Sequence, residues 1–345
     1  MSKSVGKYEN NCGMKLLGLI STFLLICVYN WEIGLSSTGF IGWLAYLMDY
    51  SIAFIVIIAS FSLYKASVSS SARKSILMAL RTLWPIVVWT LIYWGIFKLV
   101  DIFLEPGYGL SWKSVLRQII TGSNPMINPD MWVLNLILII GLLFMLLMTV
   151  SNKVAMAVMW IVTAVVLVLC VFNLWPTFDG AKESTQLLLK KVPAMITYMC
   201  AGTSLAHAGI YKDLKKHWII AQLASLAMTI LMRYLNPFGK ISGLDFSLLD
   251  KAFVGIFVVS FMYYVPFDKF SKSVQEDIDA FIGCSLGVFC LQHLIGVLFH
   301  YFVTHRSVNL EAYTLLDSTL IFVICFLISL IISKIPSKLV KLLVE

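Results

Sequence analysis

The chain has 345 residues, of which 60% are hydrophobic and only 13% are charged, and its formal net charge is +8. This composition excludes a water-soluble globular protein, because the chain has too few polar residues to cover a surface of that size. Apolar stretches of about 20 residues recur along the sequence, which is the length that crosses a hydrocarbon core of roughly 30 Å. We therefore expect an all-α, polytopic transmembrane helical bundle.

The basic residues and the cysteines exclude further classes of protein. Lys and Arg fall in short clusters between the apolar stretches and form no basic stripe, so we do not expect a nucleic-acid partner. The cysteines lie mostly inside apolar runs, without CxxC pairs and without a His at metal-ligand spacing. We interpret them as small buried apolar side chains, and no metal site is predicted.

Apolar segments bounded by Pro, Gly and charged clusters predict about ten transmembrane helices in one membrane domain that covers 1–345. They lie at 14–35, 40–64, 76–100, 131–150, 154–175, 193–210, 217–236, 251–267, 279–303 and 312–334. An even number of spans places both termini on one side. Most of the 26 Lys and Arg residues fall on that side, so the positive-inside rule predicts that both termini are cytoplasmic.

The first apolar run is longer than the core of a signal peptide and no small-residue cleavage site follows it, so we expect it to remain as an anchor. Two longer stretches fall on the outer side. The stretch 101–130 carries Gly and Pro turn signals around the amphipathic segment SWKSVLRQIITG (111–122), which is suited to the membrane interface. The stretch 177–192 ends in the amphipathic run QLLLKKV.

Ionisable or strongly polar side chains inside a membrane are costly unless they face a protein interior or water, so each is a candidate functional group. The predicted spans contain Asn30, Glu32, Asp49, Arg81, Asn135, His207, His293, His300 and Asp317.

His293 and His300 are separated by two helical turns and so share nearly the same face of their helix. An imidazole there can act as a general base or proton carrier, or it can be a hydrogen-bonded histidine of the bundle. Arg81 sits near the cytoplasmic end of its span, where it can bind the phosphate of a cytoplasmic donor or snorkel to the lipid headgroups. Glu32 and Asp49 can bind a proton, a cation or a sugar hydroxyl, or lie at the interface or in an ion pair.

Signatures of soluble nucleotide-binding and hydrolytic enzymes are absent. The sequence contains no GxxxxGK[ST], GxGxxG, HExxH or GxSxG motif, which argues against an ATP-driven pump.

Several segments carry a resemblance to a known family. They are DYSIAFIVIIASFSLYK (49–65), LRTLWPIVVWTLIYW (80–94), DMWVLNLILIIGLL (130–143), ITYMCAGTSLAHAG (196–209) and SLGVFCLQHLIG (285–296). Their order and spacing resemble the integral-membrane acyltransferase family, bacterial ten-helix proteins that acylate cell-envelope glycans.

The resemblance implies a multi-pass protein of the inner (plasma) membrane that moves an acyl group to a hydroxyl of an envelope glycan. The donor implied is a cytoplasmic acyl-CoA such as acetyl-CoA, which is a substrate and not a bound cofactor. On the same resemblance, Arg81 contacts the donor, Trp132 and Asn135 contact the substrate, and His293 matches a family histidine. Membrane lipid is the remaining expected partner, and the sequence leaves the acceptor, the acyl group and the oligomeric state open.

The first predicted helix departs from the family pattern. Asn30 occupies the position of the family's presumed catalytic His, and Leu19 occupies that of its basic residue. Asparagine cannot take up a proton at neutral pH and so cannot replace a general base. The His expected before the outer-loop Trp is also missing, because Asp130 and Met131 stand there.

Several interpretations remain open at this stage. The protein is an acyltransferase with another base, for which Glu32, Asp130 and His293 are candidates, or the alignment of the first helix is misplaced. Alternatively it is an inactive relative that transports or exports a polar solute, a proton or a surface polysaccharide. A polysaccharide polymerase would need arginines in outer loops, where Arg117 and Arg306 are available.

Overall fold

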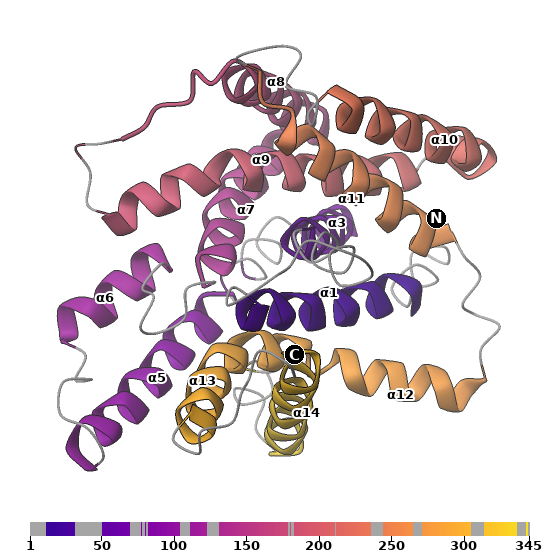
Figure 1. Ribbon diagram of the computed structural model, residues 1–345. Helices are drawn as coiled ribbons and strands as arrows, with labels where there is room; N and C mark the ends of the chain where they lie inside the picture. The colour runs from indigo at the N-terminus through magenta and orange to yellow at the C-terminus, as the bar shows by residue number, and fades with distance from the viewer. Residues whose placement is uncertain are drawn as a thin grey trace. The chain divides into compact units, whose positions relative to one another are not determined.

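The computed structural model describes residues 12–31, 50–69, 77, 80, 82–103, 111–122, 131–178, 180, 183–210, 212–235, 244–264, 271–304, 314–336 and 343. Within these residues the chain forms twelve α-helices and no strand (Figure 1). The all-helical class predicted from composition is therefore confirmed for the described residues.

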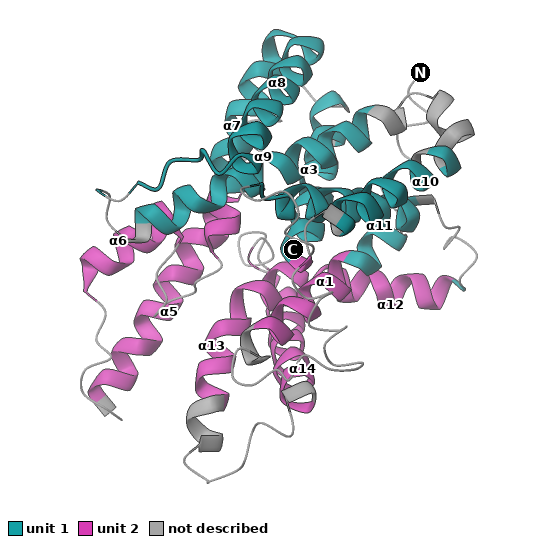
Figure 2. Cartoon of the chain, turned by 45° about the horizontal axis from the view of Figure 1, so that its top comes forward, with its two compact units in different colours: residues 1–17, 52–80, 136–271 teal, residues 18–51, 81–135, 272–345 magenta. Residues whose placement is uncertain are grey.

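The helices divide into two compact units that interleave along the sequence (Figure 2). Unit 1 comprises residues 1–17, 52–80 and 136–271, and unit 2 comprises 18–51, 81–135 and 272–345. Unit 1 contains most of α3 (Ser51–Ser69) and α7 (Trp132–Val150), with α8 (Asn152–Val171), α9 (Glu183–Ile210), α10 (Lys212–Leu235) and α11 (Ser247–Tyr264). Unit 2 contains most of α1 (Cys12–Trp31), with α5 (Leu83–Phe103), α6 (Trp112–Thr121), α12 (Lys272–Ile282), α13 (Ser285–Thr304) and α14 (Thr314–Ser333).

Four helices of the described chain are long and apolar enough to cross a membrane: Leu83–Ile102, Trp132–Val150, Asn152–Val171 and Leu316–Ser333. A fifth span results if the bent pair α12 and α13 counts as one. Shorter apolar helices lie at Gly13–Val28, Ser51–Lys65 and Gln222–Met232, within three more of the predicted spans. The structure thus supports a membrane protein, and the figure of about ten spans stays a prediction.

Helix α3 contacts three other helices of unit 1 through glycines. A Cβ atom on Gly202 of α9 would overlap the Ser60 hydroxyl and the Ile57 carbonyl oxygen of α3. Gly255 of α11 faces the Ile57 side chain, and Gly141 of α7 faces Leu63. Because apolar surface gains nothing by leaving lipid for another apolar surface, small residues that allow close backbone approach are what pack membrane helices together.

Side-chain contacts give the relative directions of helices within each unit. In unit 1, Trp160 of α8 donates to the Ser204 hydroxyl of α9 at 2.8 Å, and Thr163 of α8 lies beside Cys200 of α9. Residue numbers rise on one helix as they fall on the other, so α8 and α9 are antiparallel. In unit 2, Phe23 of α1 contacts Phe322 of α14, and Cys27 lies beside Ser318, so these helices are antiparallel as well.

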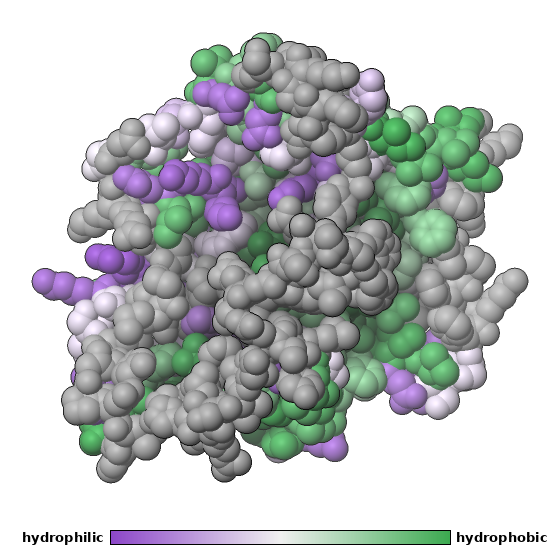
Figure 3. Space-filling view, viewed as in Figure 1, coloured by the Kyte–Doolittle hydropathy of each residue, from purple (hydrophilic) through white to green (hydrophobic). Residues whose placement is uncertain are grey.

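The outer surface of α10 is apolar. Ile219, Ile220, Leu223 and Ile230 are all more than half exposed. Figure 3 shows the resulting hydrophobic surface over α10 at the upper right. A surface of this kind would promote aggregation in water but is compatible with lipid, as expected for a bilayer-facing helix.

Two segments differ from their predicted boundaries. The ninth predicted span begins at 279, whereas α13 begins at Ser285 and is bent by 50° from α12. Gly283 lies at the break, and α12 carries acidic residues that an apolar span would not accommodate. The sixth predicted span begins at 193, whereas α9 begins at Glu183 and continues through Pro193 to Ile210, so the amphipathic run QLLLKKV is part of this helix.

Candidate functional site

Several residues singled out in the sequence lie outside the described part of the chain. These are Glu32, Asp49, Arg81, Asp130 and Arg306. Asn30 lies in the last turn of α1, but its side chain is not among those described. Their assigned roles therefore stay predictions. The predicted site residues whose side chains the structure describes are His293, Trp132 and Asn135.

His293 lies near the middle of α13 and is half-buried. Its imidazole ring stacks on the phenol ring of Tyr93 from α5, with centroids 6.4 Å apart and an interplanar angle of 17°. The residues next to His293 in the sequence, Gln292 and Leu294, are both buried. The imidazole is therefore held against an aromatic face within a tightly packed part of the helix.

Tyr93 fixes the position of α13 relative to α5. Its hydroxyl donates to the Cys290 carbonyl oxygen at 2.7 Å and accepts from the Leu294 N–H at 2.9 Å. These two backbone groups are four residues apart, the spacing at which helix groups bond to each other. The hydroxyl thus binds the turn of α13 that carries His293, and a buried polar group is satisfied at both its donor and its acceptor.

The side of α5 that carries Tyr93 is the buried side of the helix. Trp89, Tyr93 and Phe97 recur at intervals of four residues and are all at most 5% exposed. The Trp89 indole donates to the carbonyl oxygen of Leu343 at 3.0 Å, near the end of the chain. This buried face fixes the position of α5, and the two hydrogen bonds of the Tyr93 hydroxyl hold the turn of α13 that carries His293.

We predict that Tyr93→Phe lowers the free energy of unfolding by about 1 to 2 kcal/mol, because the Cys290 carbonyl loses its donor in a buried setting. Denaturant titration of the detergent-solubilised protein measures this. Tyr234→Phe, which alters an exposed side chain of α10, is the matched control and is expected to change stability by less than about 0.5 kcal/mol. Equal stability of the two variants would contradict the bridging role.

Trp132 and Asn135 lie at the start of α7 and are both buried. The Asn135 amide donates to the Ile119 carbonyl oxygen of α6 at 2.9 Å, whereas its buried Oδ1 accepts no hydrogen bond in the described structure. Gly122 ends α6 in the left-handed conformation (φ 64°), and a Cβ there would collide with the Trp132 backbone. The first turn of α7, which belongs to unit 2, therefore lies against α6 at both residues, and their contact with substrate remains a prediction.

A second group of polar side chains lies in unit 1. The Tyr64 hydroxyl of α3 and His207 Nδ1 of α9 form a hydrogen bond of 2.6 Å, and the Trp160 ring packs edge-on against the imidazole. Lys65 bonds to the Tyr263 hydroxyl of α11 at 3.4 Å, with its ammonium 4.4 Å from the centroid of the Phe61 ring.

The sequence identified His207 as a candidate but not the residues around it. Tyr64 and Lys65 are adjacent at the end of an apolar run. Two neighbouring polar side chains in that position are the sequence feature from which these residues could have been predicted. Among the described residues, no group of three or more His, Cys, Asp or Glu side chains is arranged to hold a metal ion.

These features define the class of protein: an α-helical chain with several apolar helices suited to span a membrane and with histidines held inside each unit. No protein-family model matches this chain, and no curated protein or solved structure is significantly similar to it. The functional assignment therefore depends on the residues themselves.

Proposed function

We propose that this protein is an integral-membrane O-acyltransferase, which moves an acyl group such as acetyl from a cytoplasmic acyl-CoA to a hydroxyl of a cell-envelope glycan. The observation that carries the proposal is the half-buried imidazole of His293, stacked on Tyr93 near the middle of α13. A neutral imidazole is the side chain best suited to accept a hydroxyl proton near neutral pH, and rigid positioning is what makes it effective.

In the proposed reaction, His293 removes the proton of the acceptor hydroxyl as its oxygen attacks the thioester carbonyl. The tetrahedral intermediate then collapses, the carbon–sulfur bond breaks, and the proton passes from the imidazole to the departing thiolate. Such a base makes the missing histidine at Asn30 dispensable. Arg81 retains its predicted role of binding a donor phosphate as a bidentate cation.

We also propose ten spans in the plasma membrane with both termini in the cytoplasm. The directions of neighbouring helices support this topology. If ten spans cross the membrane in alternating directions, the first and the tenth span are antiparallel, as α1 and α14 are. The fifth and sixth spans are also antiparallel, as α8 and α9 are. The second and sixth spans are then parallel. In α3 and α9, which correspond to these spans, Ile57 contacts Gly202 and Tyr64 contacts His207, so residue numbers rise in the same direction on both helices.

The test is acyl transfer by the purified full chain, with radiolabelled acetyl-CoA and envelope glycan from its own source. We expect transfer by the native protein and its loss in Arg81→Ala. Transfer only by an Asn30→His variant would contradict the role of His293 and indicate an inactive relative that keeps the scaffold. No transfer by either, with folded protein and a suitable acceptor, would contradict the acyltransferase proposal.

A second candidate function is proton-coupled transport, favoured by the Tyr64–His207 hydrogen bond. Protonatable chains inside membrane proteins commonly mark proton pathways. Proton flux in liposomes, compared between the native protein and His207→Gln, distinguishes this candidate from the first. Flux that depends on His207 in a protein without transfer activity would establish transport.

A further inference from the structure

The short helix α6 presents three distinct strips along its length. Its buried side is formed by Val115, Gln118 and Thr121. Its exposed apolar strip is formed by Trp112, Leu116 and Ile120, which are 58%, 56% and 67% exposed. These three recur every four residues, so they lie in one row on the helix surface.

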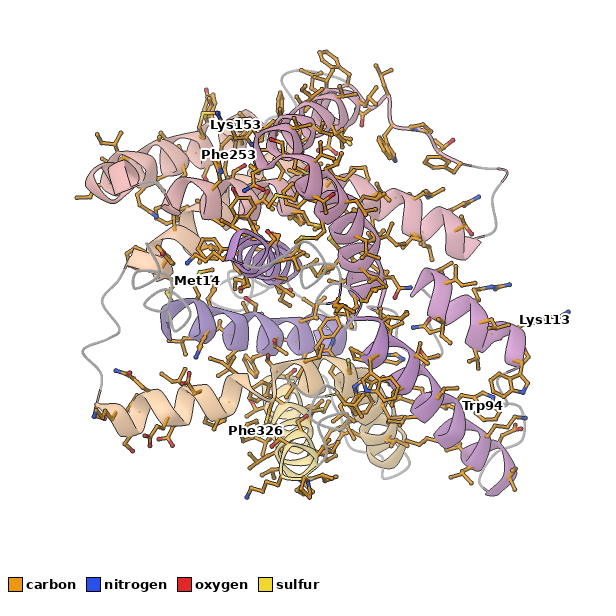
Figure 4. All side chains as sticks on the ribbon, turned by 180° about the vertical axis from the view of Figure 1, so that it is seen from behind. Met14, Trp94, Lys113, Lys153, Phe253 and Phe326 are labelled. Carbon is orange, nitrogen blue, oxygen red and sulfur yellow. The ribbon has the colours of Figure 1, made fainter. Side chains whose placement is uncertain are left out.

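Two cations border the apolar strip. Lys113 and Arg117 are exposed, and each directly follows a member of the apolar row. At 100° per residue, this places both cations between the apolar row and the edge of the buried side that carries Thr121. In Figure 4, Lys113 extends from α6 away from the neighbouring helices.

The helix is also fixed in place. Ser111 caps its first turn by accepting from the Ser114 N–H, and Gly122 ends it. Trp112 packs on Trp94 of α5 with ring centroids 4.5 Å apart, and the Asn135 amide holds the Ile119 carbonyl. The exposed strips therefore have a defined orientation on unit 2.

We propose that α6 is a binding site for an anionic phospholipid of the surrounding leaflet. The apolar row contacts the acyl chains, and Lys113 and Arg117 together bind the headgroup phosphate. The pattern suits a lipid better than a protein partner, because an aromatic and two aliphatic side chains beside paired cations reproduce the chemistry of the interface, with apolar chains next to phosphate. A purely structural helix would not need an exposed apolar row beside two exposed cations.

The test uses the full chain in phosphatidylcholine nanodiscs. The fluorescence of Trp112 is obtained by subtracting the spectrum of the Trp112→Phe variant from that of the native protein. A small fraction of brominated phosphatidylglycerol or brominated phosphatidylcholine serves as the quencher. We expect roughly tenfold enrichment of the anionic lipid at Trp112 over the zwitterionic one, weakened by added salt.

The double variant Lys113→Gln with Arg117→Gln is expected to remove the preference while quenching persists. Arg117→Lys keeps the charge and should retain most of the preference. The matched control is the pair Lys190→Gln and Lys191→Gln, two exposed cations of α9. It should leave the preference unchanged.

Three outcomes would overturn the proposal. Equal quenching by the two lipids in the native protein would remove the headgroup site. If the Lys113 and Arg117 double variant keeps its preference for the anionic lipid, the headgroup site lies elsewhere on the protein. Absence of quenching by both lipids would show that the apolar row does not contact acyl chains.

Discussion

Replacing His293 with alanine is expected to lower the rate of acyl transfer by a factor of about 10² to 10⁴, the contribution of a positioned general base. Of the two rings described at this site, the imidazole is the one that can accept a proton near neutral pH, because Tyr93 uses its hydroxyl to hold the backbone of α13. The measurement is transfer of radiolabelled acetyl from acetyl-CoA to envelope glycan under single-turnover conditions.

Two further variants separate chemistry from folding. His293→Gln keeps a hydrogen-bonding side chain of similar reach but cannot take the proton, so it should be as impaired as alanine. His217→Ala, in α10, alters a histidine that the mechanism does not use and should stay within about threefold of the native rate. Native-like transfer by either His293 variant would exclude His293 as the base and return attention to Glu32 and Asp130.

The second large effect is expected at Gly202. Gly202→Ala should lower the free energy of unfolding by about 3 kcal/mol, at the upper end of the cost of overpacking. The added methyl group would overlap the Ser60 hydroxyl and the Ile57 carbonyl of α3, and a backbone atom cannot move aside as a flexible side chain can. Denaturant titration in detergent measures the loss.

Gly95→Ala is the matched control for this prediction. Gly95 also lies inside an apolar helix, α5, but a Cβ there would meet no atom within 4 Å. Alanine favours the helix by up to about 1 kcal/mol over glycine, so this variant should be unchanged or slightly more stable. If both glycines respond alike, close approach of α3 and α9 does not contribute to stability.

Much of the fold could be predicted because it depends on local sequence. Runs of apolar residues long enough to cross a bilayer predict helices, because lipid leaves backbone groups no partner but each other. The amphipathic segment 111–122 was recognisable from its periodicity, and the structure places Ser111 and Gly122 as caps at its two ends. The position of His293 inside a helix followed from the same apolar pattern.

The sequence therefore determined the all-helical class, the approximate positions of many helices, and which polar residues fall within apolar runs. The tertiary structure alone decided that Tyr93 is the partner of His293, that Tyr64 is the partner of His207, and that Gly202 marks the contact of α9 with α3. It also decided that α12 and α13 break apart near Gly283. Each of these outcomes joins residues far apart in the chain or depends on packing against another helix, and periodicity along one segment carries no information about which other segment it meets.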